Sequence, residues 1–207
     1  MKYKAVIFDL DGTLYDNRKM RRLMVLYNWF HLNMLASERF SRHRMSGRYY
    51  GTKGATFSEL FRRIAAFSGS SEDWAAKWYW QKFMPSQVKA LRKHCHAKPW
   101  VLPLLGELKE KGVKLACYSE YSFVREKLKA LGIEPLIFDY ISDAPSAGGC
   151  KPCRKALLHV AEKLQTAPED ILMVGDREDT DGAGADSANM DFLLVPKCDM
   201  PTPSITI

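Results

Sequence analysis

The sequence predicts an α/β fold, with a Rossmann-like parallel sheet as the core and an inserted α-helical subdomain. Short apolar runs alternate with helix-like stretches after residue 98, and such alternation is typical of a parallel sheet. Before them, residues 17–98 contain 17 basic and 4 acidic residues, against 14 basic and 20 acidic in the rest of the chain. This change of charge indicates a boundary. We therefore expect a core of residues 1–15 and 99–207 and a helical subdomain of residues 16–98.

The first predicted strand ends in two carboxylates. Residues 5–8 form an apolar run typical of a buried parallel strand, and Asp9 and Asp11 follow it. Alternate strand positions point the same way, and open α/β sheets bind ligands at the carboxyl ends of their strands. Neighbouring carboxylates repel unless a cation or proton intervenes, and Mg²⁺ prefers such oxygen ligands. Taken alone, the Asp-Gly pair is equally well explained as a turn.

The inserted segment is predicted to be mainly helical. Apolar residues recur at steps of three and four over residues 20–35 and 57–67, which indicates amphipathic helices. Residues 41–54, with glycines and arginines, are expected to form a loop, and Pro85 is expected to open a further helix. Four of the five tryptophans lie in this segment. We expect them to pack a helical bundle, with a place in a substrate pocket as the alternative.

Four further apolar runs are short enough to be strands. They comprise residues 113–118, 136–138, 171–174 and 192–195. Helices are expected at residues 103–112, 121–131 and 152–164, and in a stretch of small residues that ends at 189. The last twelve residues contain three prolines and are expected to form an irregular tail. Helices between successive strands predict parallel pairing.

Polar residues follow these runs at positions suited to phosphoryl transfer. Ser119 follows the second strand, Lys151 lies in a later loop, and the run GDREDTD at residues 175–181 follows the fourth strand. With the two aspartates they supply a nucleophile, an acid or base, cation ligands and donors to phosphate oxygens. Singly, each has an ordinary structural explanation, as a helix cap, a surface lysine or a turn.

The run DLDGT at residues 9–13 resembles the first signature of the haloacid dehalogenase (HAD) superfamily, and Ser119, Lys151 and the Gly-Asp run resemble the later signatures in the same order. Most members are Mg²⁺-dependent phosphatases. The resemblance therefore implies the HAD fold and a Mg²⁺ cofactor. It also implies that the insertion, which lies between the first and second signatures, is a helical cap that closes over the active site and selects the substrate.

The resemblance implies four catalytic residues. Asp9 would attack phosphorus and form an aspartyl-phosphate, and Asp11 would protonate the leaving oxygen and then activate water. Ser119 would donate to a phosphate oxygen. Lys151 would offset the negative charge of Asp9 and of the phosphoryl group, as the repulsion between them requires.

The same resemblance implies the metal ligands. Mg²⁺ would be held by Asp9, by Asp11 through its backbone carbonyl, by Asp176 and by Asp181. Asp179 is the alternative to Asp181, because members of the family differ by one residue in that spacing.

The substrate is expected to bind between the first signature and the cap. The net charge of +13 over residues 17–98 would attract an anionic substrate. Glu120, where many members have asparagine, would be unfavourable beside a phosphate unless its side chain points away. The residues expected at the substrate site are Gly12, Thr13, Glu120, Arg18, Arg22 and Arg48.

Cysteines offer a different interpretation of one loop. Cys150 and Cys153 have the spacing of a redox or zinc pair, but no second cysteine pair completes a zinc site, so we favour coincidence. Residues 94–96, His-Cys-His, are expected to lie at the surface. The five cysteines are an odd number, and reduced thiols are expected.

No apolar run is long enough to span a bilayer, and the one that follows the basic N-terminus is too short for a signal peptide. We expect a cytoplasmic protein without a membrane partner. The predicted function is Mg²⁺-dependent hydrolysis of a small organic phosphomonoester, such as a nucleotide or sugar phosphate. The alternatives are a phosphomutase of the same superfamily and a non-catalytic protein that binds nucleic acid or another polyanion on its basic cap. Nucleic acid is not the expected partner.

Overall fold

The computed structural model describes residues 2–195. At its centre is a five-stranded sheet of order β3-β2-β1-β4-β5, and every neighbouring pair is parallel. The strands are β1 (Ala5–Phe8), β2 (Lys114–Ser119), β3 (Tyr140–Asp143), β4 (Ile171–Gly175) and β5 (Asp191–Leu194). The predicted Rossmann-like parallel sheet is thus confirmed. Because β1 is the central strand, the residues that follow it emerge in the middle of the carboxyl edge.

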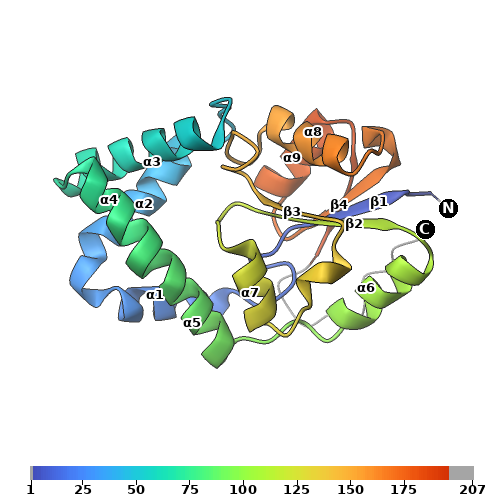
Figure 1. The fold of residues 1–207 in the computed structure, drawn as a ribbon, viewed down its shortest axis with the longest axis horizontal. Helices are drawn as coiled ribbons and strands as arrows, with labels where there is room; N and C mark the ends of the chain where they lie inside the picture. The colour runs from blue at the N-terminus through green and yellow to red at the C-terminus, as the bar shows by residue number, and fades with distance from the viewer. Residues whose placement is uncertain (1, 196–207) are drawn as a thin grey trace.

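Helices cover both faces of the sheet. They are α6 (Val101–Glu110), α7 (Val124–Ala130), α8 (Arg154–Lys163) and α9 (Ala183–Ser187). Val6 and Phe8 of β1 belong to the apolar cluster that includes α6 and α7, and Ala5 and Ile7 belong to the cluster that includes α8 and α9. Figure 1 shows these helix pairs on opposite sides of the sheet. Burial on both faces explains why β1 is apolar at every position.

Between β1 and α6 the structure describes five α-helices. They are α1 (Arg18–Tyr27), α2 (Leu32–Met45), α3 (Lys53–Ser68), α4 (Glu72–Trp78) and α5 (Met84–His94). A 3-10 turn, η1 (Trp29–His31), connects α1 to α2, and a π-helical turn, η2 (Tyr79–Phe83), connects α4 to α5. In Figure 1 these helices lie beyond the end of the sheet toward which β1 runs. The inserted segment is therefore helical, as predicted.

The loop predicted for residues 41–54 is wrong in its first part. Helix α2 continues to Met45, and its last turns are held by the buried side chains of Ser41, Arg42 and Met45. An arginine in a segment with glycines suggests a solvated loop, but the Arg42 guanidinium is paired inside the protein. Burial and ion pairing thus extend the helix beyond what its composition indicates.

The third strand is also misplaced in the prediction. Residues 136–138 fall largely in the 3-10 turn η3 (Pro135–Ile137), where Leu136 is 83% exposed. The strand at this position, β3, begins at Tyr140 and pairs with β2. Pro135 explains the error, because proline fixes φ and has no N–H to donate to a strand partner.

Within residues 2–195, two isolated β-bridges join the inserted segment to the core. Tyr15 and Ala97 form an antiparallel bridge, so the two connections to the core lie side by side. Tyr49, in the segment between α2 and α3, forms a second bridge with Gly149. This second contact brings the loop that bears Lys151 against the insertion.

Among residues 2–195, no helix combines the length and the apolar composition needed to cross a membrane. The irregular tail predicted for the last twelve residues lies outside the described residues.

Candidate active site

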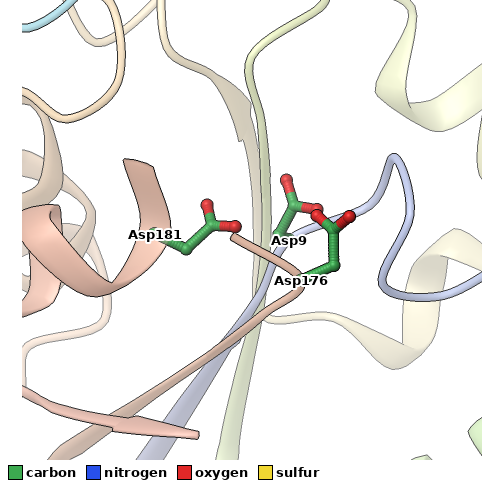
Figure 2. Close-up of side chains that lie close together, drawn as sticks. All are labelled: Asp9, Asp176 and Asp181. Carbon is green, nitrogen blue, oxygen red and sulfur yellow. The ribbon is translucent and has the colours of Figure 1, made fainter. Parts of the chain in front are cut away.

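Three carboxylates meet at the carboxyl edge of the sheet. Asp9 follows β1, Asp176 follows β4, and Asp181 lies in the π-helical turn η5 (Glu178–Gly182) before α9. All three are buried, and one oxygen of each lies within 4.8 Å of the others. Figure 2 shows the carboxylates converging from these separate segments. Within residues 2–195, no other group of three or more His, Cys, Asp or Glu side chains comes together in this way.

Lys151 joins two of these carboxylates. Its Nζ donates to Asp9 Oδ1 at 2.8 Å and to Asp181 Oδ1 at 2.9 Å. Thr13 Oγ1 donates to the other oxygen of Asp9 at 2.9 Å. Burial raises the pKa of Asp9 to about 6, although the Lys151 charge opposes the shift. Burial alone would lower the pKa of Lys151, but the charges of Asp181 and Asp9 outweigh it and the pKa is raised.

Two glycines allow the carboxylates to approach the backbone. Gly12 has φ +114°, and a Cβ there would lie 2.4 Å from Asp176 Oδ2. A Cβ on Gly175 would lie 2.5 Å from the Asp181 side chain. The Gly12 carbonyl also accepts a hydrogen bond from Lys98 Nζ at 3.0 Å. The predicted role of Gly12 at the substrate site stays a prediction, but the geometry gives a reason for glycine at this position.

The Asp11 carboxylate lies outside the cluster of three. It accepts hydrogen bonds from Tyr15 Oη at 2.6 Å, from Ser119 Oγ at 2.8 Å and from Lys127 Nζ at 3.0 and 3.1 Å. Burial alone would raise the pKa of Asp11, but the Lys127 charge and the hydrogen bonds lower it below its usual value. Its backbone carbonyl, the expected metal ligand, accepts from Asn17 Nδ2 at 2.9 Å.

Sequence reasoning missed Lys127. Its side chain is 0% exposed, and it reaches Asp11 from α7, which packs beside β2. The sequence does indicate that Lys127 is buried. It lies at helical spacing from three apolar residues, Val124, Leu128 and Leu131, and therefore on the apolar side of its helix. A buried lysine needs a partner, and Asp11 supplies it.

The Glu120 carboxylate accepts hydrogen bonds from two groups outside the carboxylate cluster. One of its oxygens accepts from the backbone N–H of Lys151 at 2.9 Å, and the other accepts from Arg42 Nη1 at 3.1 Å. Burial raises the pKa of Glu120, although Arg42 opposes the shift. The glutamate therefore links the Lys151 loop to the insertion, and its predicted place at the substrate site stays a prediction.

Arg42 is the second residue that sequence reasoning missed. Its guanidinium forms an ion pair with Glu38, donates to Tyr79 Oη at 2.7 Å, and lies 4.4 Å from the centre of the Tyr121 ring. Arg42 also forms an ion pair with Glu120, the residue next to Ser119, and this pair links the inserted helices to the core. Its charge is thus compensated inside the protein.

The three arginines predicted at the substrate site have different surroundings. Arg18 pairs with Asp16 at the surface. Arg22 lines a shallow depression with Lys19, Leu23 and His94. The Arg48 side chain is exposed, and its backbone carbonyl accepts a hydrogen bond from the loop that bears Lys151. Their roles in substrate binding stay predictions.

The alternatives left open by the sequence differ in their geometry. Asp181 belongs to the buried cluster, whereas Asp179 pairs with Arg177 at the surface. Cys150 and Cys153 are both buried free thiols. Neither cysteine belongs to a group of potential metal ligands within the described residues.

The cluster fits a hard divalent cation. Asp9, Asp176 and Asp181 offer three carboxylates, and Lys151 is the cation that contacts two of them. All the donors are oxygens, which Mg²⁺ prefers over nitrogen or sulfur. Buried carboxylates repel each other unless charge is supplied between them, so a cation at this position would remove an electrostatic cost.

Comparisons with known proteins agree with this geometry. A family model described as haloacid dehalogenase-like hydrolase matches residues 3–189. The glyceraldehyde 3-phosphate phosphatase of Methanopyrus kandleri is 30% identical over an alignment of 201 residues that covers 90% of this chain and 81% of that protein. The phosphoglycolate phosphatase of Nitrosospira multiformis is 27% identical over 199 residues, covering 93% and 83%. The crystal structure of CbbY from Rhodobacter sphaeroides in complex with phosphate has a TM-score of 0.69 at 19% identity, covering 96% of this chain and 88% of that one.

Proposed function

We propose that this chain, which belongs to the haloacid dehalogenase-like hydrolases, is a Mg²⁺-dependent phosphatase. It hydrolyses a small organic phosphomonoester through an aspartyl-phosphate. Family membership and the similarity to two phosphatases account for the phosphatase reaction. The observation that carries the finer proposal is the group of three buried carboxylates, two of which pair with Lys151.

Asp9 is the proposed nucleophile. Lys151 and Thr13 each hold one of its oxygens, so the carboxylate is oriented before the substrate arrives. Attack forms a bond between an Asp9 oxygen and phosphorus while the bond from phosphorus to the leaving oxygen breaks. The Lys151 ammonium offsets the negative charge that the two groups bring together. Mg²⁺, when bound by Asp9, Asp176 and Asp181, would add positive charge beside the phosphoryl oxygens.

Asp11 is the proposed acid and base. It gives a proton to the leaving oxygen, and it then takes a proton from the water that hydrolyses the aspartyl-phosphate. Ser119 donates to Asp11 at 2.8 Å, and the same hydroxyl is proposed to donate to a phosphate oxygen of the substrate. Two nearby carboxylates with different surroundings can thus take two different roles.

Residues 16–98 are the proposed cap. The bridge between Tyr49 and Gly149 and the Arg42–Glu120 ion pair connect this segment to the loops that bear Lys151 and Ser119. A segment so connected is well placed to exclude water and to select the organic part of the substrate. Its positive charge favours an anionic substrate.

The experiment is hydrolysis of a panel of phosphomonoesters that includes nucleotides and sugar phosphates. Wild type is assayed with Mg²⁺ and with a chelator, and Asp9→Asn is assayed with Mg²⁺. Asp179→Asn is the matched control, because this acid lies in the same run but pairs with Arg177 at the surface. We expect activity only in wild type and the control with Mg²⁺. Full turnover by Asp9→Asn, or turnover unaffected by the chelator, would contradict the proposal.

A further inference from the structure

The end of the inserted segment that is remote from the sheet carries exposed apolar side chains. Leu26, in the last turn of α1, is 68% exposed, and in η1 Trp29 is 62% and Phe30 91% exposed. We call these three residues the α1 tip. Figure 1 places the turn between α1 and α2 on the outer side of the inserted helices, away from the sheet. Large apolar side chains gathered at one exposed place indicate a surface that binds something.

Positively charged side chains lie on the same side of α1. Lys19, Arg22, Leu23 and Leu26 recur at helical spacing and form one stripe along the helix. Lys19, Arg22 and Leu23, together with His94 of α5, line a shallow depression of about 310 Å³. Within residues 2–195, no ion pair involves Lys19 or Arg22. One stripe therefore changes from cationic to apolar as it approaches the tip.

We propose that this stripe and the α1 tip bind the surface of a negatively charged lipid bilayer. Such a surface presents phosphate groups above an apolar interior, and peripheral helices match it with basic and apolar side chains. Arg22 and Leu26 are about 6 Å apart along α1, so the charged and the apolar side chains of the stripe lie about one helical turn apart. Tryptophan is favoured at this level, because its ring is apolar and its N–H is polar.

Other occupants fit the same observations less well. Two copies that joined through this face would bring like charges together, which is unfavourable. A nucleic acid would match the cations and could stack on Trp29, but it leaves the aliphatic Leu26 without a partner. A bilayer satisfies both the charge and the apolar side chains. The expectation of no membrane partner came from the lack of a membrane-spanning run, which does not bear on binding at a surface.

The experiment uses the full chain and lipid vesicles in a sedimentation assay. Vesicles contain phosphatidylcholine alone or with about 30% phosphatidylserine, as the anionic surface requires. We expect binding to the anionic vesicles only, and weaker binding as salt increases. The double variant Trp29→Ser, Phe30→Ser should bind at least about tenfold more weakly, and Lys19→Gln, Arg22→Gln should lose about tenfold or more.

Matched controls come from exposed residues of the core. Leu136→Ser removes a side chain that is 83% exposed on η3, and Arg125→Gln, Lys129→Gln removes two charges from the exposed side of α7. Both controls should bind vesicles as wild type does, and circular dichroism should show that every variant is folded.

Four results would overturn the proposal. One is no binding to anionic vesicles, or equal binding to neutral ones. Another is vesicle binding that the tip variants leave unchanged. The third is dimerisation, measured by sedimentation velocity without lipid, that disappears in Trp29→Ser, Phe30→Ser, because the surface would then belong to a second copy. Salt-dependent RNA binding lost in Lys19→Gln, Arg22→Gln, without vesicle binding, would assign the stripe to nucleic acid. None of these readouts depends on the phosphatase proposal.

Discussion

The ion pair between Lys127 and Asp11 gives the most direct test of how the site is held. In Lys127→Met the volume of the side chain is nearly kept while the ammonium is removed. The Lys127 side chain is 0% and the Asp11 side chain 19% exposed, so Asp11 would keep a largely buried charge without a cation. Breaking a buried pair costs about 3–5 kcal/mol. Because Tyr15 and Ser119 still donate to Asp11, we expect the lower end, about 3 kcal/mol at neutral pH.

Urea unfolding measures this loss. Lys129→Met is the matched control, since it removes an exposed lysine from the same helix and should change the free energy of unfolding by less than about 0.5 kcal/mol. In wild type the pKa of Asp11 is lowered, so its contribution is present above the unfolded pKa of about 3.9 and is lost below it. In Lys127→Met the pKa of Asp11 should instead be raised. As the pH falls, protonation of Asp11 should therefore narrow the difference in the free energy of unfolding between the variant and wild type. A loss below about 1 kcal/mol at neutral pH, or a difference that grows with acidity, would refute this reasoning.

Catalysis gives a second readout for the same variant, on the premise of the proposed function. If Lys127 positions Asp11 for proton transfer, the loss of turnover should depend on the leaving group. An alkyl phosphate needs a proton on its leaving oxygen, whereas p-nitrophenyl phosphate has a good leaving group and needs little help. We therefore expect Lys127→Met to slow alkyl phosphates more than p-nitrophenyl phosphate. An equal loss for both substrates would mean that Lys127 supports the fold alone.

Three further predictions concern the metal, a close approach and the link to the insertion. The pKa of Asp9 is raised to about 6, so protons compete with a metal for this carboxylate below that pH. The rise in unfolding temperature on adding Mg²⁺ should therefore be larger at about pH 7.5 than at about pH 5.5. An equal rise at the two pH values would argue against Asp9 as a ligand. Gly12→Ala places a Cβ 2.4 Å from a carboxylate oxygen and should abolish Mg²⁺ binding in calorimetry, whereas Gly106→Ala, which has open space, should not. Arg42→Met should cost about 3 kcal/mol in urea unfolding, and a similar cost for the exposed Arg44→Met would show that pairing is not the cause.

Much of the fold and of the site follows from where apolar runs end. Asp9, Ser119 and Asp176 each stand at or directly after a strand, and parallel strands end at one edge of a sheet, so their convergence is predictable from order alone. Lys151 was found through the resemblance, since a loop lysine gives no signal of its own. The β3 strand was misplaced, because a proline-led apolar turn resembles a short buried strand when its hydrogen bonds are unknown.

The two missed residues share a cause. Lys127 pairs with Asp11 across 116 residues of sequence, and Arg42 pairs with Glu120 across 78. A charged side chain is ordinarily expected to lie in water, and a distant partner is visible only once the topology is known. Periodicity could have found Lys127, because it lies on the apolar side of α7, but the same test fails for Arg42, which follows polar residues on α2.

The surroundings of Asp9 and Asp11 give these two aspartates opposite electrostatic properties. Burial raises the pKa of Asp9, and Lys127 with two hydroxyls lowers that of Asp11. A nucleophile must be ionised, and a divalent cation at the three carboxylates would add to Lys151 a further positive charge that favours the ionised form of Asp9. Asp11 is already held as the anion that a base requires. To act first as an acid it must lose part of that stabilisation, and a phosphate that takes the Ser119 hydroxyl would remove one of its hydrogen bonds. Substrate binding and the proton transfer proposed for Asp11 are therefore coupled through one serine.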